Sequence, residues 1–362
     1  MWAHLFRTGR QAAFLVVVAG GLPGGCGALA AADPLTEIKA ASGLEGLDAA
    51  KLRRGEIITG RGTQGSFGRG VYAESCYFLQ AAPEAVQRTL LHWNPSTYKE
   101  TEVSAYATYH WPAGSPEAFK TFALNEKTAV DRTLLDWTVA AGTRGEAGEL
   151  HLRPDEVAGF RQAFAGRDLA PVGAKAAAAS VAWQGLLARH SEAVGGGGFA
   201  ALPSYKAADG ATIQAAGEIR SLLKMTPKVA ARFTPLTGAR GLLDGGGTTA
   251  QEIVPYAEES LVRGHTSFCL GAMAAMPTPG ETTGFLVLDC SYYTTDTYFL
   301  SFSLYQAWPW EGGTLVWEVD YASAPFRSYL GGVDRVFAGR EMTKDSTGAV
   351  ATFRKELAKG AR

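Results

Sequence analysis

Acidic and hydroxyl side chains alternate with apolar ones toward the C-terminal end of the chain. If neighbouring antiparallel strands form there, Asp289, Ser301 and Asp320 lie in one row, and Ser303 lies beside Glu318. Paired carboxyl groups can carry out acid–base chemistry when burial or mutual repulsion separates their pKa values. Polar residues on the solvent-facing side of a sheet are far more common than catalytic ones. The pattern therefore leaves an enzyme as an alternative, without assigning it a reaction.

The histidines have no catalytic partners that the sequence reveals. His110, His151, His190 and His265 lack a Gly-x-Ser-x-Gly or His-Glu-x-x-His motif that would give them a role. Isolated histidines of this kind are usually surface residues or hydrogen-bonded core residues. They predict no site.

A glycine-rich segment near the start of the chain, Gly60-Arg61-Gly62-Thr63-Gln64-Gly65, matches the GxGxxG pattern of dinucleotide-binding loops. In those loops the phosphate sits at the N-terminus of a helix, whereas here a further strand follows at residues 71–80. We therefore predict a glycine-rich hairpin loop and no bound cofactor.

The cysteines allow two interpretations. Cys269 and Cys290 face one another in the strand pairing proposed below, and exported proteins can keep a cross-strand disulfide. Alternatively, both are small buried apolar side chains. Cys76 is then unpaired and is expected inside a strand. His265 and Cys269 do not have the spacing of a zinc site, and we predict no metal.

The N-terminus has the layout of a secretory signal peptide. Arg7 and Arg10 precede an apolar run at residues 12–19, and small residues follow. The run is shorter than the about 20 residues that cross a membrane. We predict a signal peptide at residues 1–30, no stable membrane span after its cleavage, and export to the periplasm or the exterior of a Gram-negative cell.

Cys26 leaves lipidation open as an alternative. A lipobox has an aliphatic residue three positions before the cysteine, and Pro23 stands there. Cleavage at the small-x-small site Ala28-Leu29-Ala30 is therefore favoured.

The composition excludes some partners. With 46% hydrophobic and 19% charged residues in a total of 362, the chain is typical of globular proteins. Its 34 basic and 35 acidic residues are spread evenly and give a net charge of −1. Since there is no basic stripe, we expect no nucleic-acid partner.

Residues 266–322 are predicted to form four consecutive strands whose apolar side chains share one face, because side chains on a strand alternate in direction. The hairpins pair Cys290 with Leu300 and Leu304 with Trp317. About a dozen large side chains lie on this face, and burying them is worth on the order of 20–30 kcal/mol at about 1.5–3 kcal/mol each. A covering layer must therefore pack against it.

Apolar residues at helical spacing follow the last strand and predict that the C-terminal segment supplies this layer. They are Phe326, Leu330, Val333, Phe337, Val350, Phe353 and Leu357. Each interior glycine costs a helix roughly 1 kcal/mol relative to alanine. We therefore predict a helix in two pieces, or one with a bend, with the break near Gly339.

The rest of the chain can be divided into segments by composition and by the pattern of apolar residues. Residues 31–54 are polar and alanine-rich and predict a linker. Residues 55–112 form the first part of a sheet domain, with a helix that begins at Pro83. Residues 113–250 carry several amphipathic stretches and predict a helical insertion. Residues 251–362 return to the sheet and add the C-terminal helix, which gives an α+β fold.

The segment of residues 77–90, YFLQAAPEAVQRTL, leads from a strand through an alanine-proline turn into a short helix. With the antiparallel strands and the terminal helix, it resembles the START-like (SRPBCC) helix-grip family. The resemblance covers residues 70–111 and 251–360, about 150 residues in all. In that family a curved antiparallel sheet grips a long C-terminal helix around an apolar cavity, and there is no invariant catalytic set to transfer.

The resemblance implies that a lipid or another apolar small molecule binds between the sheet and the C-terminal helix. The residues that would line the site are Met273, Tyr298, Leu300, Phe302, Trp317 and Tyr321.

Three hypotheses follow: an exported START-like binding protein, an exported enzyme such as a hydrolase whose groups converge only in three dimensions, and an envelope structural or interaction module with a solid core. A cavity of about 300 Å³ or more between sheet and helix would favour the first over the third. Asp289, Asp320 and a histidine meeting in a cleft would favour the second.

Overall fold

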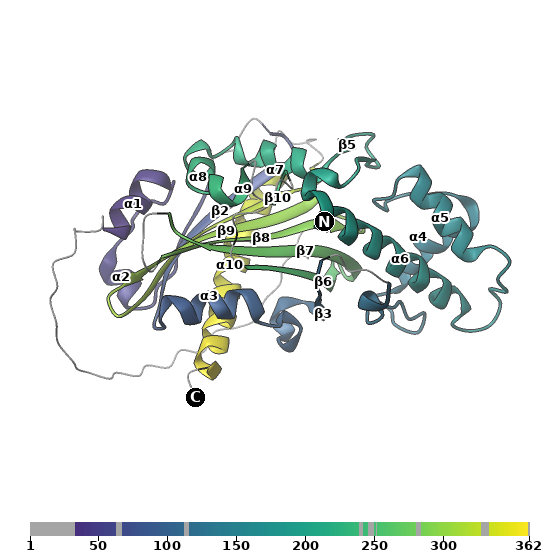
Figure 1. Cartoon of the computed structure of the whole chain (residues 1–362), viewed down its shortest axis with the longest axis horizontal. Coiled ribbons are helices and arrows are strands. Elements are labelled where there is room, and N and C mark those ends of the chain that lie inside the picture. The colour runs from purple at the N-terminus through teal and green to yellow at the C-terminus, as the bar shows by residue number, and fades with distance from the viewer. Residues whose placement is uncertain are drawn as a thin grey trace.

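One antiparallel sheet runs through the molecule (Figure 1). The computed structural model describes residues 33–62, 67–111, 116–238, 242–244, 250, 252–279, 284–326 and 333–360. The eight strands of the sheet lie in the order β1-β2-β10-β9-β8-β7-β6-β3. They are β1 (Ile58–Arg61), β2 (Gly70–Leu79), β3 (Val103–Thr108), β6 (Glu252–Val262), β7 (His265–Pro277), β8 (Phe285–Thr294), β9 (Leu300–Trp310) and β10 (Gly313–Ser323). A separate small hairpin joins β4 (Tyr205–Lys206) and β5 (Thr212–Ile213).

Helices make up most of the rest of the described chain. The α-helices are α1 (Pro34–Ala41), α2 (Ala49–Arg53), α3 (Pro83–His92), α4 (Arg132–Arg144), α5 (Pro154–Phe164), α6 (Ala174–Gly197), α7 (Ala215–Leu223), α8 (Pro227–Arg232), α9 (Thr234–Thr237) and α10 (Val333–Gly360). The 3-10 turns are η1 (Pro95–Thr97), η2 (Lys99–Thr101), η3 (Pro116–Phe119) and η4 (Phe199–Ala201). The predicted α+β fold, with an antiparallel sheet, a helical insertion and a long C-terminal helix, is confirmed.

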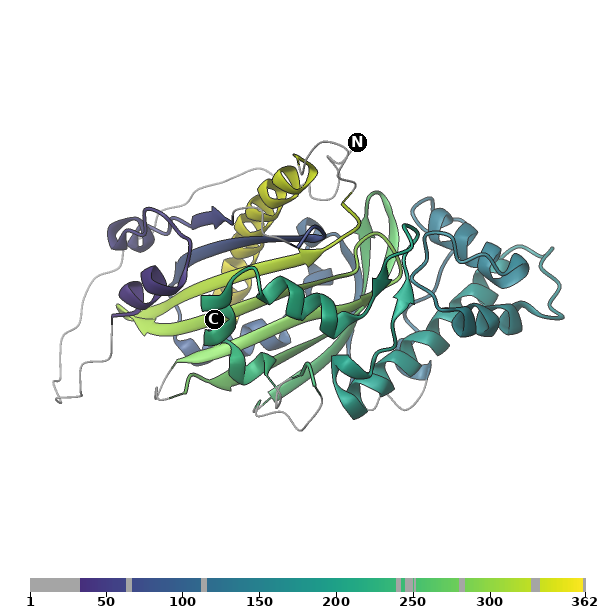
Figure 2. The same cartoon turned by 90° about the horizontal axis from the view of Figure 1, so that it is seen from above.

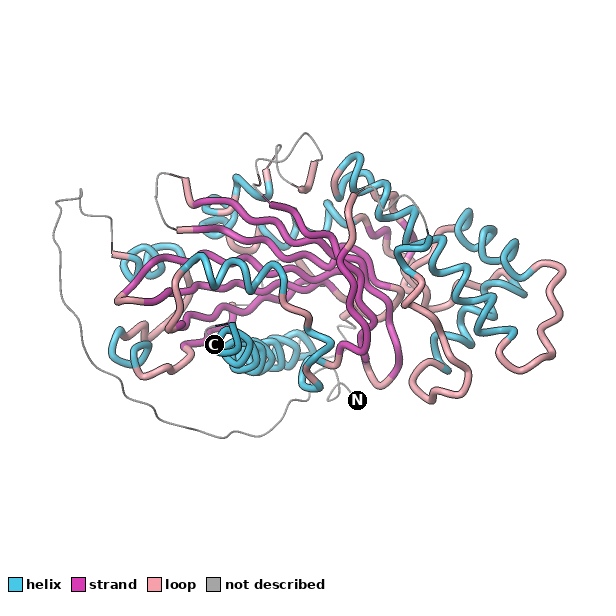
Figure 3. The backbone as a smooth tube through the Cα atoms, turned by 60° about the horizontal axis from the view of Figure 1, so that its bottom comes forward, coloured by secondary structure: helices cyan, strands magenta, loops and turns pink. Residues whose placement is uncertain are grey.

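Helices cover both faces of the sheet. Figures 1 and 2 show α7, α8 and α9 on one face and α10 on the other, and Figure 3 brings α3 and α10 forward. Phe233, between α8 and α9, packs near Trp317 with 6.2 Å between ring centroids. On the opposite face, Val350 and Phe353 of α10 share a core with Val316 of β10. We call these the insertion face and the α10 face.

The predicted cover of the apolar face is wrong. Leu300, Phe302, Trp317 and Tyr321 lie in the core of the insertion face, away from α10. The period of two in a strand shows which residues share a face, but not which later segment covers that face. Their neighbours come from the insertion, for example Thr226, whose hydroxyl lies 2.5 Å from the Tyr321 hydroxyl.

The strand pairings differ from the predicted ones by an even number of residues in two hairpins and by an odd number in the third. Cys290 pairs with Phe302, and Leu304 pairs with Val319, each two residues from the predicted partner. An even shift keeps every side chain on its predicted face. Between β7 and β8 the shift is odd, because Cys290 pairs with Ala272.

Because of the odd shift, Cys269 and Cys290 do not face one another. Cys269 lies opposite Thr294 rather than Cys290, and all three described cysteines, Cys76 included, are free and buried. The shift also turns Met273 toward the α10 face, where it belongs to the core of Val350 and Phe353. The disulfide interpretation is therefore wrong, and Cys76 is buried in β2 as predicted.

The helical insertion has two parts. Helices α4, α5 and α6 pack on one another at one end of the sheet, and Trp183 of α6 donates a hydrogen bond to the Thr138 hydroxyl of α4 at 2.9 Å. Helices α7 to α9 then cross the sheet. Glu218 of α7 receives hydrogen bonds from Arg69 at 2.6 Å and from the Ser323 hydroxyl at 2.5 Å. The insertion is thus bonded into the sheet that it covers.

The N-terminal segment predicted as a linker folds instead. It forms α1 and α2, capped by Asp33 and Asp48, and buries Leu35, Ile38 and Leu52 in the insertion-face core. The predicted signal peptide, Cys26 included, lies outside the described residues. Within those residues no helix is both long and apolar enough to cross a membrane.

Helix α10 is one helix from Val333 to Gly360, so the predicted alternative of two pieces divided near Gly339 is wrong, and the alternative of one helix with a bend stays a prediction. Phe337, predicted to point inward, is 54% exposed, whereas Val350 and Phe353 are buried. Helix α3 begins at Pro83 as predicted. Strands β1 and β2 pair antiparallel, and Gly60 and Arg61 of the glycine-rich segment belong to β1. Residues 63–66 lie outside the described residues.

Replacing Trp317 with alanine should lower the free energy of unfolding by about 3–5 kcal/mol, because the indole is 1% exposed and its Nε1–H donates to Glu74 at 3.1 Å. The control Phe337→Ala should cost less than about 0.5 kcal/mol. Urea unfolding of both variants measures the difference, and equal losses would show that Trp317 is not a core residue.

Candidate functional site

A cavity of about 70 Å³ lies between the α10 face of the sheet and helices α3 and α10. Its wall includes four aromatic side chains and two carboxyl groups. The lining residues are Tyr77, Leu90, Trp93, Met273, Val287, Asp289, Tyr305, Glu318, Ala349, Val350 and Phe353. We call it the sheet–helix cavity.

Strand geometry brings the polar groups of the cavity together. Asp289 of β8 pairs with Ser303 of β9, and Ser303 pairs with Asp320 of β10, so their side chains point to the same face. Glu318 and Tyr305 are partners in the same ladder. The two aspartates of the predicted row do share a row, but Ser303 stands between them instead of Ser301. Glu318 pairs with Tyr305 instead of Ser303, and the row lies beneath α10 instead of facing solvent.

The helices close the cavity from the other side. Helix α3 starts with Pro83, which suits the first turn, and it buries Val86, Leu90 and Leu91 against the sheet. Trp93 follows directly after this helix. Its ring meets Phe353 of α10 edge-on, with 6.0 Å between the ring centroids.

Glu318 and Asp320 are two acidic residues on the same face of β10, and each affects the pKa of the other. Burial, followed by repulsion from Asp320, raises the pKa of Glu318 well above its usual range. Glu318 is 5% exposed and accepts a hydrogen bond from the Ser75 hydroxyl at 3.0 Å. Burial also raises the pKa of Asp320, against the effect of donors from Ser303 at 2.6 Å and Ser346 at 2.5 Å. Of the two, Glu318 is thus the carboxyl group whose charged form is more strongly disfavoured.

Asp289 is the second carboxyl group of the cavity wall. The Tyr256 hydroxyl donates to its Oδ1 at 2.8 Å. Burial raises the pKa of Asp289 to about 6; the Tyr256 hydrogen bond lowers it and the charge of Asp320 adds to the increase. Asp289 therefore remains mostly ionised at pH 7, in a wall that burial makes unfavourable for charge.

Two further acidic groups interact with those at the cavity, Glu258 with Asp289 and Asp345 with Asp320. Burial raises the pKa of Glu258 to about 7 and that of Asp345 to about 8. Arg354 of α10 donates to the backbone carbonyls of Gly55 at 2.9 Å and Phe78 at 3.1 Å instead of to a carboxylate. None of the described residues that line the cavity is basic.

The six residues predicted to bind a ligand are divided between the two faces. Met273 lines the sheet–helix cavity. Tyr298 lies in the turn between β8 and β9. The predicted position is wrong for the other four, which lie in the insertion-face core: Leu300, Phe302, Trp317 and Tyr321.

The sequence did not reveal most of the residues that line the sheet–helix cavity. Asp289 and Glu318 were interpreted as solvent-facing, and Tyr77, Trp93 and Tyr305 received no role. One signal was available, because Tyr305 and Phe285 share the alternating face of Asp289 and are too apolar for a fully wet surface.

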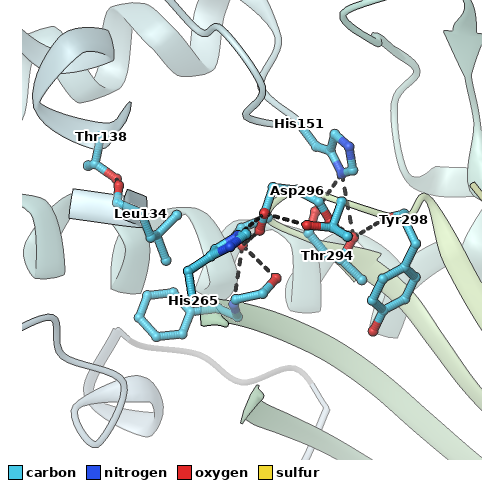
Figure 4. A network of polar contacts seen from close by, with 11 residues as sticks. Leu134, Thr138, His151, His265, Thr294, Asp296 and Tyr298 are labelled. Carbon is cyan, nitrogen blue, oxygen red and sulfur yellow. Dashed lines mark hydrogen bonds and ion pairs between the residues drawn. The ribbon is translucent and has the colours of Figure 1, made fainter. Parts of the chain in front are cut away.

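A second polar cluster joins the insertion to the sheet (Figure 4). His265 Nε2 lies 2.5 Å from Asp296 Oδ2, and Asp296 is fully buried. Burial raises the pKa of Asp296, but its contacts with His265, Thr297 and Thr295 outweigh that effect, so the net pKa is lowered.

The same cluster includes a neutral histidine. His151 Nδ1 lies 2.9 Å from the Thr294 carbonyl, and burial lowers the pKa of His151 to about 4. Because the groups are paired with the framework around them, we interpret this cluster as structural.

A much smaller cavity, of about 10 Å³, lies beside the ion pair of Glu156 and His190, whose Oε1 and Nε2 are 2.7 Å apart. It admits about one water molecule. In the described part of the chain, no group of three or more His, Cys, Asp or Glu is placed to hold a metal ion. The sheet–helix cavity is therefore the best candidate site.

Comparison with known proteins adds little. No family model and no curated protein matches the sequence. Among solved structures, the crystal structure of Ara h 8.0201 is similar over 36% of this chain and 84% of that chain, with 11% sequence identity and a TM-score of 0.19. A likeness this weak assigns neither fold nor function. The START-like resemblance therefore stays a prediction.

The raised pKa of Asp289 predicts a pH-dependent stability difference between the wild type and Asp289→Asn. Between about pH 4 and pH 6 the folded protein keeps a proton that the unfolded chain has lost, so wild-type stability falls as pH rises. The variant has no ionisable group at this position and does not lose stability in this way. Its free energy of unfolding should therefore rise by on the order of 1–3 kcal/mol relative to that of the wild type between pH 4 and pH 6. Urea unfolding at pH 4 and pH 7 checks this, and a constant difference between the two proteins would refute it.

Proposed function

We propose that the protein binds a small organic molecule in the sheet–helix cavity. The observation that carries the proposal is the lining itself, in which aromatic and aliphatic walls surround two carboxyl groups. Small-molecule sites are concave and mostly apolar, with a few polar groups that orient the ligand. A solid core has no reason to keep such carboxyl groups under a helix, because each costs stability when it is buried.

The volume of the cavity limits the size of the ligand that can bind there. A volume of about 10–15 Å³ on this measure admits one water, so about 70 Å³ takes a group on the order of five non-hydrogen atoms. This is well below the about 300 Å³ of sites for larger ligands. A whole lipid chain does not fit without displacement of α3 or α10. The proposal is therefore narrower than the lipid expected from the family resemblance.

Binding is favoured over catalysis by the same lining. Asp289 lies in the cavity wall and Asp320 next to it, but the described lining holds no histidine, serine, cysteine or lysine. The carboxyl groups can orient and pair with a ligand. The nearby hydroxyl groups of Ser75 and Ser303 already donate hydrogen bonds to Glu318 and Asp320, and among the described lining residues no serine, cysteine or lysine is present as a nucleophile.

Blocking the cavity should abolish binding. Ala349 lines it from α10 with its side chain at the exposed mouth, so Ala349→Phe fills the space without removing a core residue. Thermal-shift screening of compounds with on the order of five to ten non-hydrogen atoms should give stabilising hits with wild type that disappear in this variant.

The control for this screen is Ala351→Phe, at an exposed position of the same helix outside the cavity. It should keep every hit. Hits that survive Ala349→Phe would place binding elsewhere, and a screen with no hits would count against the proposed function.

We also propose that the protein is exported, on the basis of the predicted signal peptide at residues 1–30. Expression of the full chain in a Gram-negative host should yield a periplasmic form whose N-terminus begins close after Ala30. Fractionation followed by N-terminal sequencing measures this. Recovery of the uncut chain in the cytosol would contradict export.

A further inference from the structure

The charge balance of the sheet–helix cavity points to a class of ligand. Asp289 stands in the wall with Tyr256 as its hydrogen-bond donor, and no described lining residue is basic. The neighbouring groups Glu318 and Asp320 are also acidic. An anionic ligand would meet repulsion here, and a neutral one would leave the carboxylate charge uncompensated in a poorly solvated place.

The aromatic side chains favour the same kind of ligand. Tyr77, Trp93, Tyr305 and Phe353 all line the cavity, from four different parts of the chain. Aromatic faces attract cations through their quadrupole, and cages of such rings recognise methylated ammonium groups. The described lining contains no protein cation that already uses these faces.

The alternatives to an organic cation fit less well. A bare metal ion needs several ligands that converge, and no group of three or more candidate ligands is placed for this in the described residues. A tetrahedral ammonium group with its methyl substituents has about five non-hydrogen atoms, which matches the volume of about 70 Å³. Its apolar surface suits Leu90, Val287 and Met273, and its charge suits Asp289.

We infer that the cavity recognises the ammonium end of a small organic amine, with Asp289 as the counter-ion and the aromatic side chains as the cage. The inference rests on the proposed binding function and specifies its ligand class. Any longer part of the ligand extends through the mouth beside Ala349.

Choline and its neutral isostere 3,3-dimethylbutan-1-ol test the inference, because they have the same shape and differ in charge. Isothermal titration of the purified protein at pH 8 should give a choline affinity at least about tenfold above that of the isostere. Asp289→Asn should lower the choline affinity about tenfold and leave the isostere unchanged. Glu84→Gln, an exposed change on α3 outside the cavity, should alter neither affinity.

A second variant protects the test against misfolding of Asp289→Asn. Trp93→Leu keeps an apolar side chain but removes the aromatic face, so the choline affinity should fall several-fold while that of the isostere holds. Equal binding of choline and isostere, or choline binding that neither variant weakens, would overturn the amine inference and leave the binding function standing. If neither compound binds, the amine inference fails; if the wider screen also yields no compound that Ala349→Phe blocks, the proposed function fails with it.

Discussion

The whole structure depends on a sheet that needs a cover on each face. The insertion face carries the larger apolar set, and its burial is a major contribution to stability. The helices that cover it come from the middle of the chain, and buried polar contacts join them to the sheet. Glu218 of α7, for example, lies 105 residues before Ser323, whose hydroxyl donates a hydrogen bond to it. Removing the insertion would therefore expose the main core and would not merely trim a peripheral lobe.

Because the insertion helices cover one face of the sheet, α10 covers the other. That face is mixed, with Val316 and Val287 beside Glu318, Asp320 and Asp289. Helix α10 meets it with mixed side chains, so that Val350 packs on the apolar part while the Ser346 hydroxyl donates to Asp320. A helix with a uniform apolar stripe would remove the Ser346 donor from Asp320, and the loss of a donor is costly for a buried carboxylate. The mixture of apolar and hydroxyl side chains along α10 is the pattern that this interface requires.

Local patterns predicted the elements well, and long-range choices could not be predicted. Alternation identified strands β8 to β10, and Pro83 marked the start of α3, because these depend on neighbouring residues. The pairing of Cys290 with Ala272 depends on the loop between β7 and β8, and a register shift between Leu270 and Gly271 then places Cys269 opposite Thr294. Alternation encodes neither. The error of three residues there reversed the face of Met273. The identity of the covering layer was equally hidden, since both the insertion and the C-terminal segment offered apolar helices.

The carboxyl groups beneath α10 are the place where the sequence departs from what stability alone would favour. Replacing a buried set of charged or polar groups with well-packed apolar residues is often neutral or stabilising. Here Glu318 and Asp320 instead lie on β10 and Asp289 on β8 of a packed sheet, and burial raises the pKa of each. Their hydroxyl donors lower this cost without supplying a positive charge. Departures of this kind are expected at functional sites, and a cationic ligand would supply the charge that the surrounding protein leaves out.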